Sequence, residues 1–393
     1  MSFYPLASTT WGAEEQSALQ EVIASGAFTM GQRVKEFESQ FAEHFGSNFA
    51  VMFNSGSSAN LALLAALRYD TTVKLPLNSN IIVPAVSWST TYYPVNQLGY
   101  KLNFVDIDLE TLNLDVNQIE AAIDKNTSAI LAVNLLGNPC DLQKIRDIAT
   151  KHNLIFVEDN CESMGATLNS KQAGTFGLAG TYSTFFSHHI STMEGGVVVT
   201  DSESLMHTLK SIRAHGWTRD LPAKNFVHDK SGNDWEDLFR FVLPGYNLRP
   251  LEMEAALGTQ QLRKLDDFIL QRRQNAAYLK SITPKLRNFL FQKETGNSSW
   301  FGFSVVLKNE FRGRRSEVIE MLSEAGIETR PIVTGNFTSN PVMKHMDYLP
   351  LPNLHNADEI HTNGFFVGNH HYSIQPQLDR LVEVLAEFED RND

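Results

Sequence analysis

The chain has 393 residues, which is long enough for a sizeable hydrophobic core and for two domains. Its hydrophobic content of 42% and charged content of 20% are typical of a soluble globular protein. The formal net charge of −12 argues against a nucleic-acid-binding protein, whose surface would be basic, but does not exclude a small anionic ligand.

The sequence carries no signal of secretion or membrane insertion. Its start lacks the basic and apolar regions of a signal peptide, and no apolar run approaches the roughly 20 residues that span a bilayer. Its two cysteines, Cys140 and Cys161, are too few for a four-cysteine iron–sulfur cluster, and no metal site is expected. We therefore expect a cytoplasmic protein with neither nucleic acid nor membrane as a partner.

The first part of the chain alternates predicted helices and strands. Apolar residues at helical intervals predict amphipathic helices over residues 14–25 and 33–45, the first with Leu19, Val22 and Ile23 on one face. Further helices are predicted at 58–67 and 142–152. This alternation implies a mostly parallel sheet covered on both faces. The predicted strands are 49–53, 80–84, 102–105, 128–134, 154–157, 180–186 and 196–200.

The pattern changes after about residue 255. One long helix is predicted over residues 258–279, followed by a turn-rich segment. The remaining predicted elements are a strand at 299–307, a helix at 316–326 and a final helix near 378–388. We therefore predict a large α/β domain over residues 1–255, which includes an N-terminal arm, and a smaller α+β domain over residues 256–393.

Residues 183–196, STFFSHHISTMEGG, identify a candidate cofactor site. This segment resembles the stretch S-F-H-x-T-K-N-I-T-T-G-E-G-G of the DegT/StrS-type nucleotide-sugar aminotransferases. The family's lysine, which binds pyridoxal phosphate, falls on His188, and no lysine occurs between Lys171 and Lys210. An imidazole cannot form the Schiff base that an amine forms, so we expect the cofactor to be held without a covalent bond.

The resemblance covers nearly the whole chain and implies an architecture. It predicts the fold-type-I aminotransferase fold, with a mostly parallel seven-stranded sheet in the large domain. It also implies a homodimer with active sites at the subunit interface. A site shared between subunits would make dimerisation necessary for activity.

Two motifs at the ends of predicted strands suit a phosphorylated aromatic cofactor. The small residues 54–59 place backbone N–H groups and hydroxyls at a helix start, which suits a phosphate, although alone they more often mark only a capped helix. Asp159 matches the family aspartate that keeps the pyridine nitrogen protonated; its alternative role is to cap a turn or helix. Glu162 matches the family's Gln/Glu position near the ring hydroxyl of the cofactor. The residues implied to bind the phosphate here are Gly56, Ser57 and Ser58.

Three further residues match cofactor contacts of the family. Trp88 follows the predicted strand 80–84 and corresponds to the aromatic residue that stacks on the pyridine ring. A tryptophan at that place is otherwise more often part of the core. Ser187 and Asn247 correspond to phosphate contacts, with the asparagine reaching across the dimer interface.

Two alternative roles for the pair His188 and His189 have less support than a catalytic one. A metal pair is disfavoured because adjacent residues of an extended segment point to opposite faces. A structural histidine in a decayed enzyme conflicts with the intact cofactor motifs. A segment with histidine in place of the lysine instead resembles the corresponding segment of the nucleotide-sugar 3-dehydratases. One type acts on CDP-hexuloses with an iron–sulfur cluster, and the second acts without a metal on GDP-4-keto-6-deoxy-D-mannose.

The resemblance to the second type implies a reaction. L-glutamate converts pyridoxal phosphate to pyridoxamine phosphate, whose amine condenses with the sugar ketone. His188 acts as the base and, once protonated, helps the C3 hydroxyl to leave. Hydrolysis then releases GDP-4-keto-3,6-dideoxy-D-mannose and ammonia. This product would lead to a dideoxysugar such as colitose in an O-antigen.

Several more residues are candidates for contacts with the substrate. His215 is a second candidate for proton transfer, although residues 213–219 could equally be a solvated basic helix end. Two alternatives to the dehydratase stay open: a 4-aminotransferase with an untethered cofactor, and a catalytically silent nucleotide-sugar-binding regulator. The sequence sets neither the nucleotide, nor the sugar's stereochemistry, nor the amino donor. The arginines predicted to bind substrate phosphates or the glutamate carboxylate are Arg219, Arg249 and Arg330.

Overall fold

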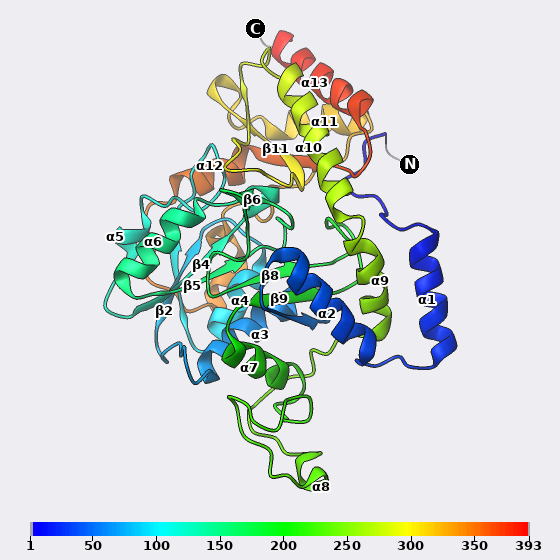
Figure 1. The fold of residues 1–393 in the computed structure, drawn as a ribbon. Helices are drawn as coiled ribbons and strands as arrows, with labels where there is room; N and C mark the ends of the chain where they lie inside the picture. The colour runs from blue at the N-terminus through cyan, green and yellow to red at the C-terminus, as the bar shows by residue number, and fades with distance from the viewer. Residues whose placement is uncertain (1–2, 392–393) are drawn as a thin grey trace.

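The centre of the molecule is a seven-stranded sheet in the order β1-β9-β8-β5-β4-β2-β3 (Figure 1). The structure, a computed structural model, describes residues 3–391; the first two and last two residues of the predicted domains lie outside this range. Strand β9 runs antiparallel to both neighbours, and the other pairs are parallel. The strands are β1 (Phe49–Phe53), β2 (Asn80–Pro84), β3 (Lys101–Val105), β4 (Thr127–Val133), β5 (Ile155–Asp159), β8 (Ala179–Ser183) and β9 (Gly196–Thr200).

The predicted mostly parallel sheet is therefore confirmed, with one strand shorter than expected. The strand predicted over residues 180–186 ends at Ser183. Beyond it the chain folds back on itself, because Thr184 donates its N–H to the carbonyl of Gly195 and Phe186 donates to Met193. Residues 184–195 thus form a loop at the end of β8 instead of continuing the sheet.

Helices cover both faces of this sheet. On one face α3 (Gly56–Tyr69), α4 (Ser89–Gln97) and α7 (Glu203–Arg213) pack on the strands. On the other, α2 (Gln32–Phe45) buries Phe37, Phe41 and Phe45 at helical spacing. The same face carries α5 (Ile119–Ala122), α6 (Leu142–His152) and α9 (Glu252–Leu262).

Helix α1 (Ala13–Ser25) buries a narrower face than its sequence predicted. Its buried residues are Glu15, Ala18 and Val22, whereas Ile23 is 59% exposed. Helix α1 packs mainly on α9, so only a narrow stripe is covered. Glu15 is buried because its carboxylate accepts hydrogen bonds from Gly12 N–H and from Lys264.

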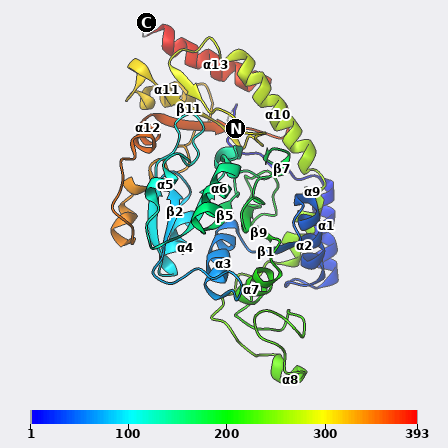
Figure 2. The same ribbon diagram turned by 60° about the vertical axis from the view of Figure 1, so that its left-hand side comes forward.

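The prediction of one long helix over residues 258–279 is wrong. The segment contains α9 and a second helix, α10 (Leu265–Ile282), separated at Arg263 and Lys264. Helix α9 packs on α1 and α2, whereas α10 packs on α13 (Gln375–Asp390). Figures 1 and 2 show α10 leaving the side of the sheet and running toward α13. The chain must change direction to reach both packing partners.

A second, antiparallel sheet lies beside the first. It consists of β10 (Phe289–Phe291), β11 (Gly302–Leu307) and β12 (Gly364–Gly368). Its core includes residues of α10, α11 (Arg315–Glu324) and α13, and also Tyr4 from the N-terminal segment. The division at residue 255 stays a prediction. Shorter elements are β6 (Thr167–Leu168), β7 (Lys171–Gln172), α8 (Asp234–Asp237) and α12 (His355–Asn363).

A lobe between α7 and α9 projects from the rest of the molecule. It comprises residues 219–245 and contains α8, which lies far from the sheet in both views (Figures 1 and 2). Its base is fastened by the pairing of Trp217 with Phe241. None of the helices between residues 3 and 391 is both long and apolar enough to cross a membrane.

A close backbone contact joins the two sheets. Ser299 N–H donates to Gly137 O at 2.9 Å, and Phe301 N–H donates to Leu136 O at 3.1 Å. Gly137 has a φ of 92°, and a Cβ atom there would lie 2.4 Å from the backbone nitrogen of Trp300. Only glycine therefore permits this approach, which sets the position of residues 298–301.

Replacing Gly137 by alanine is expected to destabilise the fold by more than the backbone strain of a positive φ alone. Gly99 is a matched control, because its φ is 83° but a Cβ there meets nothing within 4 Å. Gly99→Ala should lower the free energy of unfolding by about 1–2 kcal/mol, and Gly137→Ala by roughly 1–3 kcal/mol more, from overpacking. Denaturant titration of both variants measures the difference. Equal losses would contradict the close contact.

Candidate active site

A cavity of about 390 Å³ opens where the carboxyl ends of the parallel strands meet the second sheet. Open α/β sheets bind ligands at this edge, and the volume suits a small ligand. Its wall is completed from the side of the second sheet by Phe301, Arg330 and Phe366. The predicted residues that line it are Gly56, Ser57, Trp88, Asp159, Glu162, Ser187, His188 and Arg330. Those that do not line it are Ser58, His215, Arg219, Asn247 and Arg249.

One end of the cavity is formed by the start of α3. Ser55 caps this helix, with its Oγ accepting from Ser58 N–H at 3.0 Å and donating to Ser58 Oγ at 3.0 Å. A Cβ atom on Gly56 would lie 2.7 Å from the Cβ of Ser183, so glycine keeps this end open. Ser57 Oγ lies 2.9 Å from the hydroxyl of a threonine at the start of α4. Hydroxyls beside a helix N-terminus fit a phosphate group.

A fixed carboxylate lies at the end of β5. Asp159 is 5% exposed, and its Oδ2 accepts hydrogen bonds from Asn60 Nδ2 at 2.8 Å and Thr91 Oγ1 at 2.7 Å. Its Oδ1 accepts from Cys161 N–H at 3.2 Å. These donors hold the carboxylate in the cavity wall, where it can accept a hydrogen bond from a protonated ring nitrogen.

A second carboxyl group in the wall titrates near neutrality. Burial, and secondly the charge of Asp159, raises the pKa of Glu162 to about 7, while a hydrogen bond from Leu136 N–H opposes the rise. A carboxyl group that is partly protonated can donate a hydrogen bond as well as accept one. Glu162 can therefore pair with a ring hydroxyl in either protonation state.

His188 lies between two aromatic rings. Its ring centroid is 5.8 Å from that of Phe185 and 5.2 Å from that of Phe301, and both contacts are edge-on. Its Nδ1 is buried and has no hydrogen-bond partner in the described part of the chain. Burial, and secondly the charge of Arg272, lowers the pKa of His188 to about 4. The imidazole is thus neutral near pH 7 and able to accept a proton.

His189 has a different environment from its neighbour. It is fully buried, does not line the cavity, and its Nε2 donates to Ser299 O at 3.2 Å. The two adjacent imidazoles of this loop therefore have different roles. His188 faces the cavity, and His189 fastens the loop to the segment that leads into the second sheet.

Apart from Ser58, which lies in the first turn of α3, the predicted residues outside the cavity form a second group at the base of the lobe. The guanidinium carbon of Arg219 lies 3.7 Å from the ring centroid of Trp217, and that of Arg249 lies 5.6 Å from it. Arg249 Nε also donates to Asn247 Oδ1 at 3.0 Å. His215 packs edge-on against the same tryptophan, at 5.0 Å. Two arginines are thus displayed on one aromatic ring.

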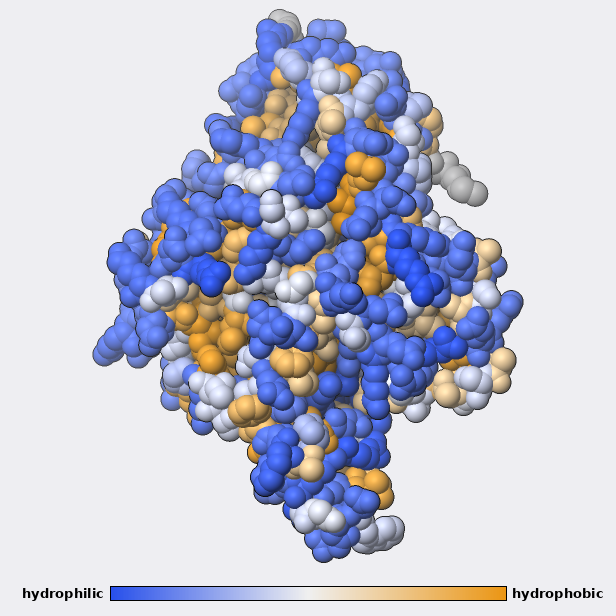
Figure 3. Space-filling model, in the orientation of Figure 1, coloured by the Kyte–Doolittle hydropathy of each residue, from blue (hydrophilic) through white to orange (hydrophobic). Residues whose placement is uncertain are grey.

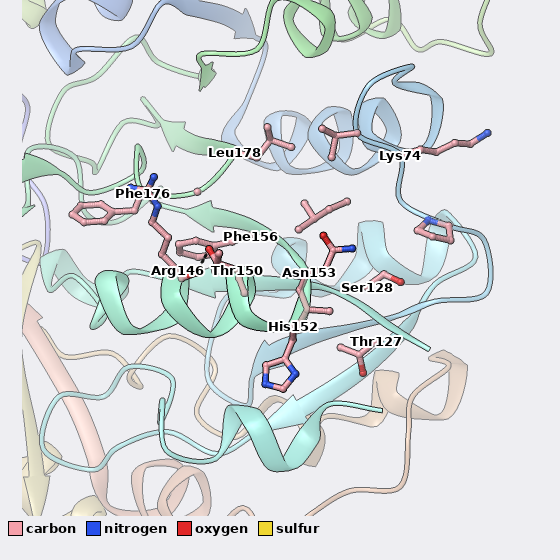
Figure 4. Close-up of a pocket in the computed structure, with 16 residues that line it drawn as sticks. Lys74, Thr127, Ser128, Arg146, Thr150, His152, Asn153, Phe156, Phe176 and Leu178 are labelled. Carbon is pink, nitrogen blue, oxygen red and sulfur yellow. Dashed lines mark hydrogen bonds between the residues drawn. The ribbon is translucent and has the colours of Figure 1, made fainter. Parts of the chain in front are cut away.

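A larger cavity, of about 750 Å³, lies at the opposite edge of the sheet (Figure 4). It is bounded by the amino ends of β4 and β5 and by the end of α6, away from the predicted residues. Figure 4 shows Lys74 and His152 pointing away from its centre, and His152 is bound to Glu120. Its position and its side chains offer no chemistry comparable to that of the smaller cavity.

Sequence reasoning missed several residues that build the site. Asn60 was detectable, because it is a polar residue within an otherwise apolar stretch of α3. Phe301 and Arg272 were not, because they are far from His188 in the sequence: Phe301 meets its ring only through the fold, and Arg272 acts on it through its charge. Thr91 was hidden among the hydroxyl residues that begin α4.

Comparison with known proteins gives matches over nearly the whole chain. The sequence profile of the DegT/DnrJ/EryC1/StrS aminotransferase family matches residues 9–386. The chain is 53% identical over 384 residues to a GDP-4-keto-6-deoxy-D-mannose 3-dehydratase of Escherichia coli O55:H7, covering 97% of this chain and 99% of that protein.

Two solved structures are similar over nearly the full length. One, a GDP-4-keto-6-deoxymannose-3-dehydratase with a trapped PLP–glutamate geminal diamine, has a TM-score of 0.95 at 52% identity and covers 97% of this chain and 100% of its own. The second is a histidine-to-asparagine variant of such an enzyme with bound GDP-perosamine, with a TM-score of 0.95, 53% identity and coverage of 97% and 100%. These matches confirm the predicted aminotransferase fold, and the chain belongs to the DegT/DnrJ/EryC1/StrS aminotransferase family.

Proposed function

We propose that this chain catalyses the pyridoxal-phosphate-dependent 3-dehydration of GDP-4-keto-6-deoxy-D-mannose, with L-glutamate as amino donor. The products are GDP-4-keto-3,6-dideoxy-D-mannose, ammonia and 2-oxoglutarate. The observation that carries the proposal is a neutral imidazole, His188, at the lysine position of a cavity whose remaining cofactor residues are intact. The 53% identity to an enzyme named for this reaction supports it.

The residues of the cavity fit pyridoxal phosphate. The start of α3, with Ser57, and the loop residue Ser187 would hold the phosphate. Asp159 would pair with the pyridine nitrogen, and Glu162 with the ring hydroxyl. Trp88, which lines the cavity but is 56% exposed, offers a flat face to the ring. When bound, the cofactor supplies an electron sink and carries the amino group between glutamate and sugar.

His188 acts as base and then as acid in this proposal. Neutral at physiological pH, it accepts a proton on its imidazole and returns it to the C3 oxygen as the hydroxyl leaves. Phe185 and Phe301 pack edge-on against the ring and fix its orientation. Because no amine is present at this position, no side chain competes with the amino donor for the cofactor.

We also propose a homodimer in which each lobe completes the partner's site. Arg219, Asn247 and Arg249 are predicted to bind phosphates, yet they lie outside their own cavity. Figure 3 shows apolar residues on the surface of the lobe. Exposed aromatic clusters of this kind mark interaction surfaces. The exposed aromatic residues of the lobe are Phe226 (45%), Trp235 (83%), Phe239 (64%) and Phe241 (57%).

We propose the cytoplasm as the location and dideoxysugar synthesis of the colitose type as the role. Cys140 and Cys161 are both free thiols, which suits a reducing compartment. A 3-deoxy ketone still attached to its nucleotide is a precursor rather than an end product, so a reductase and a glycosyltransferase are the classes of enzyme expected to consume it.

The first test is the product formed from GDP-4-keto-6-deoxymannose, pyridoxal phosphate and L-glutamate. Mass spectrometry should find a ketone that lacks one oxygen, together with 2-oxoglutarate and ammonia. His188→Asn should lower the rate by about 10²- to 10⁴-fold, because it removes the group that transfers the proton. An unchanged absorbance titration with the cofactor is the control for folding. A stable amino sugar from the unaltered protein would instead indicate an aminotransferase.

The phosphate contact is tested with two adjacent serines. Ser57→Ala removes a hydroxyl that lines the cavity and should weaken the affinity for pyridoxal phosphate by about 10- to 100-fold, the value of a hydrogen bond to a charged group. Ser58→Ala removes a hydroxyl that does not line the cavity and that accepts a hydrogen bond from Ser55, and should change the affinity by no more than about twofold. Absorbance titration measures both affinities. An equal loss of affinity in the two variants would argue against a phosphate bound by the Ser57 hydroxyl.

The shared site is tested by mixing two inactive variants. One carries His188→Asn, and its counterpart carries Arg219→Ala with Asn247→Ala. If each lobe serves the partner's cavity, a heterodimer contains one intact site, and an equal mixture should regain about a quarter of the original activity. Sites formed within single chains would leave the mixture inactive. Sedimentation analysis checks that each variant is a dimer.

A further inference from the structure

Arg272 is a buried cation without a counter-charge. It lies on α10 with 4% of its surface exposed, and no carboxylate is within ion-pair distance of it in the part of the chain that the structure describes. Burial lowers its pKa to about 10, so it remains charged near pH 7. A buried charge is costly unless it is paired, so this arrangement calls for a physical reason.

The guanidinium binds backbone carbonyls of two separate segments. Its Nη1 donates to Asn369 O at 2.8 Å and to Phe301 O at 3.1 Å, with Trp300 O at 3.4 Å. Its Nε is buried without a partner among the described residues. Carbonyl dipoles stabilise the charge without neutralising it, so its field acts on neighbouring groups.

These contacts lead directly to His188. Phe301, whose carbonyl Arg272 holds, places its ring 5.2 Å from the ring of His188. Ser299, two residues earlier, accepts the hydrogen bond of His189. One side chain of α10 therefore fastens the segment that shapes the imidazole's environment.

We propose that Arg272 is a positioning residue for His188: it ties residues 300 and 301 against the imidazole, and its uncompensated charge adds to the burial that disfavours the protonated imidazole. The importance of this for catalysis rests on the function proposed above. Its electrostatic part concerns this chain's own residues and can be measured without cofactor or substrate.

The surroundings of the imidazole support this assignment. Burial is the larger cause of the lowered pKa of His188, and Arg272 is the charge that adds to it. The same charge contributes to the lowered pKa of three further histidines nearby, His189, His370 and His371. The remaining titratable or charged groups that line the cavity with His188 are Asp159, Cys161, Glu162, Glu194 and Arg330.

Three substitutions separate the effect of the Arg272 charge from that of its hydrogen bonds to the backbone carbonyls. Arg272→Gln removes the charge but keeps a donor for the carbonyls, and Arg272→Lys keeps the charge. Arg273→Met is a matched control from the next position of the same helix. Arg273 also binds the segment before β11, through Ser298 O at 2.9 Å and Asn297 O at 3.3 Å, but the lowered pKa of His188 comes from burial and Arg272.

The measurement is histidine NMR on cofactor-free protein labelled at the imidazole carbon, with the His188 signal assigned from its absence in His188→Asn. In the unaltered protein this signal should move only below about pH 5, well under the range of an ordinary histidine. Arg272→Gln should raise the midpoint of the titration by about half a unit or more, because a nearby like charge is lost. Arg272→Lys and Arg273→Met should leave it in place. An unmoved midpoint in Arg272→Gln, or a shift of equal size in Arg273→Met, would overturn the proposal.

Kinetics give a second readout of the same effect. In Arg272→Gln the acid limb of the pH–rate profile should move to higher pH, because the base now protonates at a higher pH, while in Arg272→Lys it should stay in place. If Arg272→Gln does not fold, Arg272→Met, which also lacks the charge, takes its place: an upward shift of the His188 midpoint supports the role of the charge, and an unmoved midpoint overturns it. Absence of turnover in the unaltered protein would refute the proposed function but leave the NMR result decisive.

Discussion

The contact between the turn at residues 135–137 and the segment at 298–301 is the constraint on which the site depends. The large sheet alone supplies a carboxylate, a helix N-terminus and a loop bearing two histidines. The wall opposite them comes from a different sheet, and it reaches them only because a glycine lets two backbones meet. The position of Phe301 against the imidazole of His188 follows from that contact.

The site shows how one side chain can redirect a family scaffold. The groups that suit phosphate and pyridine recognition are built into strand ends and a helix start, so they are independent of residue 188. Exchanging an amine for an imidazole there leaves recognition in place and changes what can be done with a proton. The surrounding aromatic rings and the buried guanidinium then favour the neutral ring over the charged one.

Much of the fold was predictable because its signals are local. Each strand of the large sheet is a short apolar run, and Phe37, Phe41 and Phe45 repeat at helical spacing. The break at Lys264 was not predictable, because both sides of it are good helix sequence and only packing on two different partners separates them. Ile23 was misplaced for a related reason, since periodicity does not tell how much of a helix face is covered.

The candidate site likewise contains residues that local sequence signals predict and residues that they do not. Residues next to the family motifs, such as Ser57 and Asp159, could be assigned by position, whereas Phe301 and Arg272 act across the fold and leave no local signal. A cofactor held only by such non-covalent contacts obeys mass action. Its occupancy follows its free concentration, and the stability it lends the folded protein rises only logarithmically with that concentration. Where a lysine would retain the cofactor through dilution, this chain must be resupplied with it, so the fraction of the protein that is active is coupled to the free cofactor pool around it.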